Sequence, residues 1–246
     1  METQIPLIQT LATFLSLFLL TYLFARFIFS RSWGPKHVAE ASSCAISLVH
    51  GTPAVLLAIH ALTTCRSGNF ASPNTDSQNL VLDFSIAYFM VDLLHYLLFF
   101  PTDLLFIGHH LATLYVFTTC RFVVRHGAFA LLVLLVLAEV TSGCQNLWTL
   151  SGFRKDEEPK ALKLHEFLSP RFYVFYSVCR GVLGPFFVFK MGAFYASGAA
   201  DEVIPKWAWI SWMLVIGVAT LLSNFWVFNL WIDWYNKRSL KSGKQA

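Results

Sequence analysis

The chain has 246 residues, of which 56% are hydrophobic and 13% are charged, and its formal net charge is +4. About 25% of the residues of a soluble globular domain are charged, so this composition excludes an ordinary soluble protein and indicates that lipid surrounds most of the chain. The small positive charge also argues against a nucleic-acid partner. We therefore predict a single all-α, polytopic membrane bundle.

Seven apolar segments follow one another along the chain. A helix that crosses the hydrocarbon core needs about 20 mostly apolar residues, and the segments cover approximately residues 5–29, 39–63, 80–100, 104–120, 127–150, 170–195 and 205–235. The fourth segment is short, so six spans remain the alternative if it does not cross fully. The charged stretch at residues 152–167 is predicted to form a loop, and Pro185 is expected to kink the sixth segment.

Basic residues indicate the orientation, because Lys and Arg favour short loops on the cytoplasmic side. If the N-terminus is non-cytoplasmic, the cytoplasmic side holds Arg26, Arg31, Lys36, Arg154, Lys155, Lys160, Lys163, Lys237, Arg238, Lys241 and Lys244. The opposite side holds Arg66, Arg121, Arg125 and Lys206. We therefore expect a cytoplasmic C-terminus.

Ionisable side chains in the third segment mark the start of a candidate site. An ionisable group in the hydrocarbon costs a few kcal/mol and usually faces the interior of the bundle. Asp92 and His95 lie three positions apart in this segment. They therefore share one helix face and could hydrogen-bond.

The fourth segment contains FIGHHLATLYVF, in which His109 and His110 interrupt an apolar run. Adjacent residues of a helix point about 100° apart. Only one imidazole can therefore aim straight into a common pocket, while the other reaches sideways. Thr113, four positions after His109, shares its face.

The fifth and sixth segments add further polar groups. Glu139, Ser142 and Asn146 follow the pattern i, i+3 and i+7, which places them in one stripe of a helix. Arg180 lies inside the sixth segment. We expect the third to fifth segments to form one interior site around a lipid-sized cavity.

Helix bridging and metal binding are alternative roles for these polar groups. Polar side chains in membrane spans often only bridge helices, for about 0.6 kcal/mol each. The histidines and carboxylates could also ligate zinc or iron, but they are too few for a membrane di-iron enzyme, so we expect no metal. The sequence contains no GxSxG motif, the pattern that would indicate a serine hydrolase.

The order YFMVDLLHY, GHHLAT and LAEVTSGCQNLW resembles the TLC family, named for TRAM, Lag1 and CLN8 homology. The resemblance is strongest to small plant members that consist of little besides this domain. It divides the chain into residues 1–30 with the first helix, a TLC domain at 31–238 and a short cytoplasmic tail at 239–246. It also implies the endoplasmic reticulum or another endomembrane as the location.

The resemblance implies a role in membrane lipid metabolism or homeostasis. Ceramide synthases of this family transfer an acyl chain from acyl-CoA to the amine of a sphingoid base, whereas other members have no settled reaction. His109 and His110 match the paired histidines of the synthases, and Glu139 stands in place of a first essential aspartate. Ser142 replaces the second aspartate by a neutral hydroxyl.

If the chain is an N-acyltransferase, His109 would act as base or nucleophile, Glu139 or Asp92 would orient it, and His110 would stabilise the oxyanion. The expected contacts to the lipid come from His95, Thr113, Ser142, Asn146 and Arg180. Acyl-CoA would be a co-substrate, and no bound cofactor is expected. The alternative is a non-enzymatic lipid-handling or cargo-trafficking protein that binds a lipid or fatty acyl chain.

Overall fold

The computed structural model describes residues 7–35, 37–65 and 68–242. The N-terminal residues 1–6, the second half of the predicted tail (243–246), and the basic residues Lys36, Arg66 and Lys244 used for the orientation lie outside these ranges. Among the described residues all regular structure is helical. This confirms the predicted all-α membrane bundle.

Seven helical rods make up the described chain. They are α1 (Leu7–Ser32), α2 (Val38–Thr63), α3 (Asp76–Phe99), α4 (Leu104–Thr118) with the π-helix η1 (Thr119–Val124), α5 (Ala128–Glu139) with α6 (Ser142–Arg154), α7 (Pro159–Tyr176) with the π-helix η2 (Ser177–Leu183) and α8 (Gly184–Ala196), and α9 (Lys206–Ser242). Six of the rods are long and apolar enough to cross a membrane. The rod formed by α4 and η1 is not one of the six.

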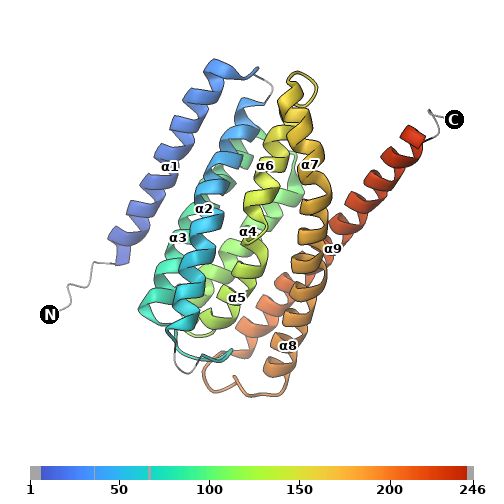
Figure 1. Cartoon of the computed structure of the whole chain (residues 1–246). Coiled ribbons are helices and arrows are strands. Elements are labelled where there is room, and N and C mark those ends of the chain that lie inside the picture. The colour runs from blue at the N-terminus through green and yellow to red at the C-terminus, as the bar shows by residue number, and fades with distance from the viewer. Residues whose placement is uncertain (1–6, 36, 66–67, 243–246) are drawn as a thin grey trace.

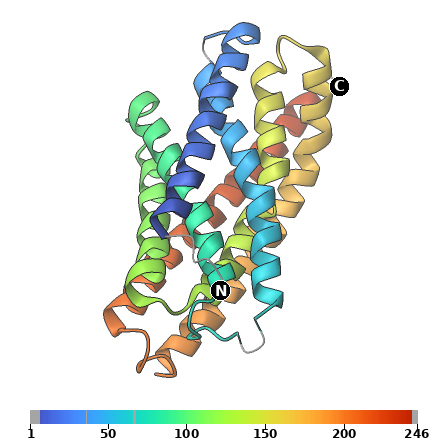
Figure 2. The same ribbon diagram turned by 90° about the vertical axis from the view of Figure 1, so that its left-hand side faces the viewer.

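The rods lie side by side along one common direction, with α1 at the edge next to α2 and α3 (Figure 1). The last helix, α9, slants across the bundle, packs on α7 and η2 through Trp226, Leu230 and Trp231, and diverges from the other helices only toward its end (Figures 1 and 2). The α1–α2 and α6–α7 connections lie at the same end of the bundle as the end of α9 (Figure 1). Among the six candidate spans α3 is the most buried, with 67% of its most apolar stretch of 18 residues buried.

Local signals set several of the helix ends. Thr75 and Gln78 form a capping box at the start of α3, in which the Gln78 amide donates to Thr75 Oγ1 and Gln78 Oε1 accepts from the Thr75 amide. Pro159 occupies the first turn of α7, where its missing N–H costs nothing.

The predicted loop at residues 152–167 is wrong over most of its length. The α6 helix continues to Arg154 and α7 begins at Pro159, so only a tight turn separates them. Lys, Glu, Leu and Ala are strong helix formers, and charged residues do not end a helix that extends beyond the hydrocarbon. Pro170 therefore lies within α7 rather than at its start.

Candidate functional site

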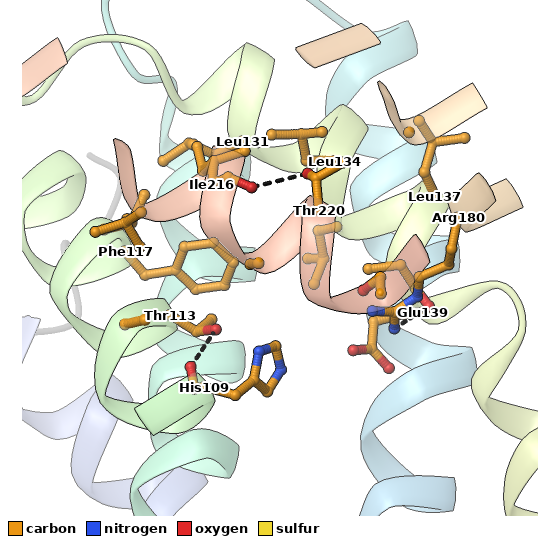
Figure 3. A pocket seen from close by; sticks show the side chains of 18 of the residues that line it. His109, Thr113, Phe117, Leu131, Leu134, Leu137, Glu139, Arg180, Ile216 and Thr220 are labelled. Atoms are coloured by element: carbon orange, nitrogen blue, oxygen red, sulfur yellow. Dashed lines mark hydrogen bonds between the residues drawn. The ribbon is translucent and has the colours of Figure 1, made fainter. Parts of the chain in front are cut away.

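A pocket opens between α4, α5, η2 and α9, with Phe89 of α3 at its wall. Its cavity has a volume of about 160 Å³, which is smaller than the roughly 300–1,000 Å³ typical of small-molecule sites. Its apolar wall includes Val116, Phe117, Leu131, Leu134, Leu135 and Ile216. Figure 3 shows Leu131, Leu134 and Ile216 on one side of the pocket and His109, Glu139 and Arg180 on the other. The pocket is thus amphipathic.

His109 is the exposed member of the histidine pair, and its ring points into the pocket (Figure 3). Its ring contacts are aromatic, with Phe89 at 6.3 Å and His110 at 5.6 Å between ring centroids. Within the described chain no residue hydrogen-bonds to the ring. Thr113 also lines the pocket, but its hydroxyl donates to the His109 carbonyl at 2.9 Å. The His109 imidazole is therefore available to a ligand.

Arg180 reaches the pocket from the π-helix η2, and π-turns are frequent at functional sites. Its Nη2 donates to the Ala138 carbonyl oxygen at 2.8 Å. This carbonyl lies beside the break between α5 and α6, where Val140 and Thr141 interrupt the helix. A side chain inserted into the ladder of backbone hydrogen bonds is a common cause of such a break. The interruption therefore gives Arg180 a fixed anchor at the wall of the pocket.

His110 points sideways into the protein and is only 3% exposed. Its Nδ1 lies 2.7 Å from the Phe106 carbonyl oxygen and its Nε2 lies 2.9 Å from Asp92 Oδ2. Because a carbonyl can only accept, Nδ1 is the donor, so Nε2 and the Asp92 carboxyl share a proton. Asp92 also accepts from Ser43 at 2.7 Å and from Tyr88 at 3.2 Å. Asp92 therefore pairs with His110 and not with His109.

A second buried pair joins Glu139 to His50 of α2. Glu139 Oε2 accepts from Ser142 Oγ at 2.6 Å and lies 3.8 Å from His50 Nδ1. His50 is completely buried, its Nε2 lies 3.1 Å from Ser85 Oγ, and its ring stacks on Tyr88 at 4.1 Å. His50 was not among the predicted site residues. Its position inside an apolar segment, SLVHGTPA, was the signal that could have identified it.

Gly51 makes this second pair possible. A Cβ at this position would lie 2.8 Å from Ser142 Cβ and 3.2 Å from Glu139 Oε2. Small residues allow membrane helices to approach closely. The absent side chain at Gly51 therefore brings α2 against the junction of α5 and α6.

The other predicted ligand contacts lie away from the pocket. His95 faces α1, where its Nδ1 lies 2.9 Å from the Tyr22 hydroxyl. Asn146 donates to Ser47 Oγ of α2 and to the Ser142 carbonyl, both at 2.9 Å. Ser142 is itself only 6% exposed. Of the predicted site residues, the structure thus brings His109, Thr113, Glu139 and Arg180 together at the pocket.

The third to fifth spans do not form the site alone, because α2 contributes Ser43 and His50 to the two acid–histidine pairs, and the pocket extends further. Its wall also requires η2 and residues of α9 such as Ala219 and Thr220. Nothing in the polar pattern of the sequence marks these two residues as pocket-lining. In the described ranges no group of three His, Cys, Asp or Glu side chains is arranged to hold a metal ion.

The comparisons with known proteins agree with this architecture. The profile of the TLC domain matches residues 40–232. A TLC domain-containing protein of Arabidopsis thaliana is 57% identical over 239 residues, which cover 96% of this chain and 93% of that protein. No solved structure matches the chain significantly. From the profile match and the identity to the plant protein, together with the six candidate spans, we conclude that this integral, multi-pass membrane chain belongs to the TLC domain family.

Proposed function

We propose that this protein binds a lipid with a long acyl chain in the pocket and acts in membrane lipid metabolism or homeostasis. The observation that carries the proposal is the amphipathic lining of the pocket. Apolar side chains of α4, α5 and α9 form one end, and His109, Glu139 and Arg180 form the other. Ligand sites typically combine such apolar walls with a few polar groups that fix the orientation of the ligand.

Filling the pocket tests this proposal. Ala219 lines the pocket from α9, whereas Leu221 of the same helix is 72% exposed. We expect the Ala219→Phe variant, purified in mild detergent, to lose most of the lipid that co-purifies with the unchanged protein. Native mass spectrometry would measure the bound lipid, and Leu221→Phe is the matched control. Equal lipid occupancy in both variants would exclude the pocket as the binding site.

Acyl transfer is a second candidate function, which the unpartnered His109 ring favours. A ring nitrogen would attack the carbonyl carbon of an acyl-CoA thioester, and the carbon–sulfur bond would break with release of the thiolate. An amine would then attack the acyl-imidazole, forming the carbon–nitrogen bond and regenerating His109. Glu139, which lines the same pocket, would accept the proton that the amine loses.

A covalent adduct distinguishes the two functions. After incubation with palmitoyl-CoA, the enzyme hypothesis predicts an increase in mass by one acyl group on His109, located by peptide mass spectrometry. The adduct should be absent from His109→Ala and present in His60→Ala, because His60 is exposed on α2. An unmodified His109 in protein that still binds lipid would support lipid handling without chemistry, including a cargo or trafficking role.

We also propose an endomembrane location, with the endoplasmic reticulum as the first candidate, and a cytoplasmic C-terminus. Arg31 and Arg154 lie near the ends of α1 and α6, at the end of the bundle where α9 also ends (Figure 1). This distribution supports the orientation through the positive-inside tendency. A glycosylation acceptor sequence fused after residue 246 should stay unmodified. Its glycosylation would reverse the orientation.

A further inference from the structure

The charge of Arg180 has no partner of opposite sign in the described part of the protein. The ion pairs found there use Glu40, Asp83, Asp92, Glu139, Glu157 and Asp201, and none of these carboxylates pairs with Arg180. Glu139 shares the pocket, but its Oε2 is turned to Ser142 and His50. Within the described ranges, the hydrogen-bond acceptor of Arg180 is the neutral carbonyl of Ala138.

The guanidinium also has hydrogen-bonding capacity to spare. It carries five N–H donors in a planar fork that matches a carboxylate or a phosphate. Nη2 uses the Ala138 carbonyl, whereas Nε is buried and has no acceptor among the described residues. An unpaired charge in a membrane interior costs several kcal/mol, and such residues usually mark a ligand or ion site. The protein therefore holds a cation ready at the polar end of the pocket.

Resting on the proposed lipid-binding function, we infer that Arg180 binds an oxyanion at the head of the lipid. The ligand is then an acyl-chain lipid with a carboxylate or phosphate head, and its chain lies against the apolar wall formed by residues such as Phe117 and Leu131. His109, exposed at the same end, offers a second hydrogen-bond donor to the head. An ionised acceptor makes the stronger bond to Arg, because charge-assisted hydrogen bonds are about twice as strong as neutral ones.

Three radiolabelled probes with the same chain separate the head-group chemistries: hexadecanoic acid, hexadecyl phosphate and methyl hexadecanoate. Their dissociation constants would be measured on the purified full chain in mild detergent. We expect at least one of the two anions to bind roughly 10-fold to 100-fold more tightly than the ester, as is typical of hydrogen bonds to charged groups. The anion that binds more tightly identifies the head as carboxylate or phosphate.

Substitutions at Arg180 show whether this preference depends on its charge. Arg180→Gln keeps a polar side chain and should reduce the affinity for the anion to that for the ester. Arg180→Lys keeps the charge and should retain part of the preference. Lys190→Gln removes an exposed cation of α8 and should leave the preference for the anion unchanged. Equal binding of all three probes to the unchanged protein, or an equal loss of all three in Arg180→Gln, would overturn the inference.

The Ala219→Phe variant distinguishes a failure of the Arg180 inference from a failure of the proposed lipid-binding function. If Ala219→Phe weakens binding of every probe but the ester binds as well as the anions, the pocket holds a lipid and Arg180 does not select an anion. If Ala219→Phe changes no affinity, the pocket is not the lipid site, and both proposals are wrong.

Discussion

Two chemically identical neighbours, His109 and His110, occupy opposite environments on the same helix. His110 is buried and tied at both ring nitrogens, to the Phe106 carbonyl and to Asp92. His109 faces the pocket, and its ring contacts the rings of Phe89 and His110. The angle of about 100° between successive residues separates the two roles. One imidazole holds helices together, and the other is left available for a ligand.

Two sides of the bundle also differ in how deeply their helices are buried. Around α3, 67% of the most apolar window is buried, whereas only 6% of the corresponding window of α9 is buried. The α2–α3 side contains the two acid–histidine pairs, and the α9 side contains the pocket. The acid–histidine pairs therefore lie on the more buried side of the bundle, and the pocket lies beside the most exposed of the candidate spans. Four substitutions test this division through the free energy of unfolding.

The largest effect should follow from Asp92→Ala. This substitution leaves His110, Ser43 and Tyr88 without their shared acceptor. Removing one partner of a buried pair typically costs about 3–5 kcal/mol. Reversible unfolding in mixed detergent micelles would measure the loss. A loss below about 1 kcal/mol would mean that Asp92 does not stabilise the α2–α3 side as a buried acceptor.

Gly51→Ala should have the next largest effect. The new Cβ would lie 2.8 Å from Ser142 Cβ, so α2 must move away from the junction of α5 and α6. Overpacking of this kind costs about 1–3 kcal/mol. Gly217→Ala is the control, because a Cβ at that position of α9 meets no atom within 4 Å. If the two variants unfold alike, the close approach at Gly51 does not limit packing.

A smaller loss is expected from Tyr22→Phe, which removes the hydroxyl that hydrogen-bonds to His95 Nδ1. Hydrogen bonds between membrane helices contribute about 0.6 kcal/mol on average. The measurement is the same unfolding titration, with Tyr235→Phe as the control because Tyr235 is 70% exposed. A loss above about 2 kcal/mol would show that the α1–α3 contact depends on this bond more than an ordinary helix bridge does.

The smallest effect on stability should come from His109→Ala. Its ring makes no hydrogen bond in the described structure and already faces open space, so the free energy of unfolding should change by less than about 0.5 kcal/mol. A loss comparable with that of Asp92→Ala would show that both histidines are structural. That result would contradict the assignment of His110 to helix packing and of His109 to ligand binding, on which the pocket hypothesis depends.

Much of the fold could be predicted because bilayer thickness imposes a length on every apolar segment. The second and third spans begin and end within a few residues of their predicted positions. The break at Val140 and Thr141 could not be predicted, since neither residue is a Gly or Pro. It lies beside the Ala138 carbonyl, which accepts a hydrogen bond from Arg180, a residue distant in sequence.

The candidate site was predictable in part. His109, Glu139 and Arg180 stood out because ionisable residues are rare in an apolar helix, and all three line one pocket. The partner of each acid could not be predicted, because helix periodicity fixes the direction of a side chain only relative to its own helix. Thus Asp92 pairs with His110, and Glu139 with the overlooked His50.

The amino-acid sequence by itself determined a membrane bundle of apolar helices, the polar residues inside it and the divergence of the two adjacent histidines. These properties follow from composition and from the geometry of a single helix. Only the tertiary structure decided that α9 closes the pocket, that Gly51 lets α2 reach Glu139, and that Arg180 has no carboxylate partner in the described chain. Such features depend on how helices distant in sequence pack against one another, and no local pattern encodes that packing.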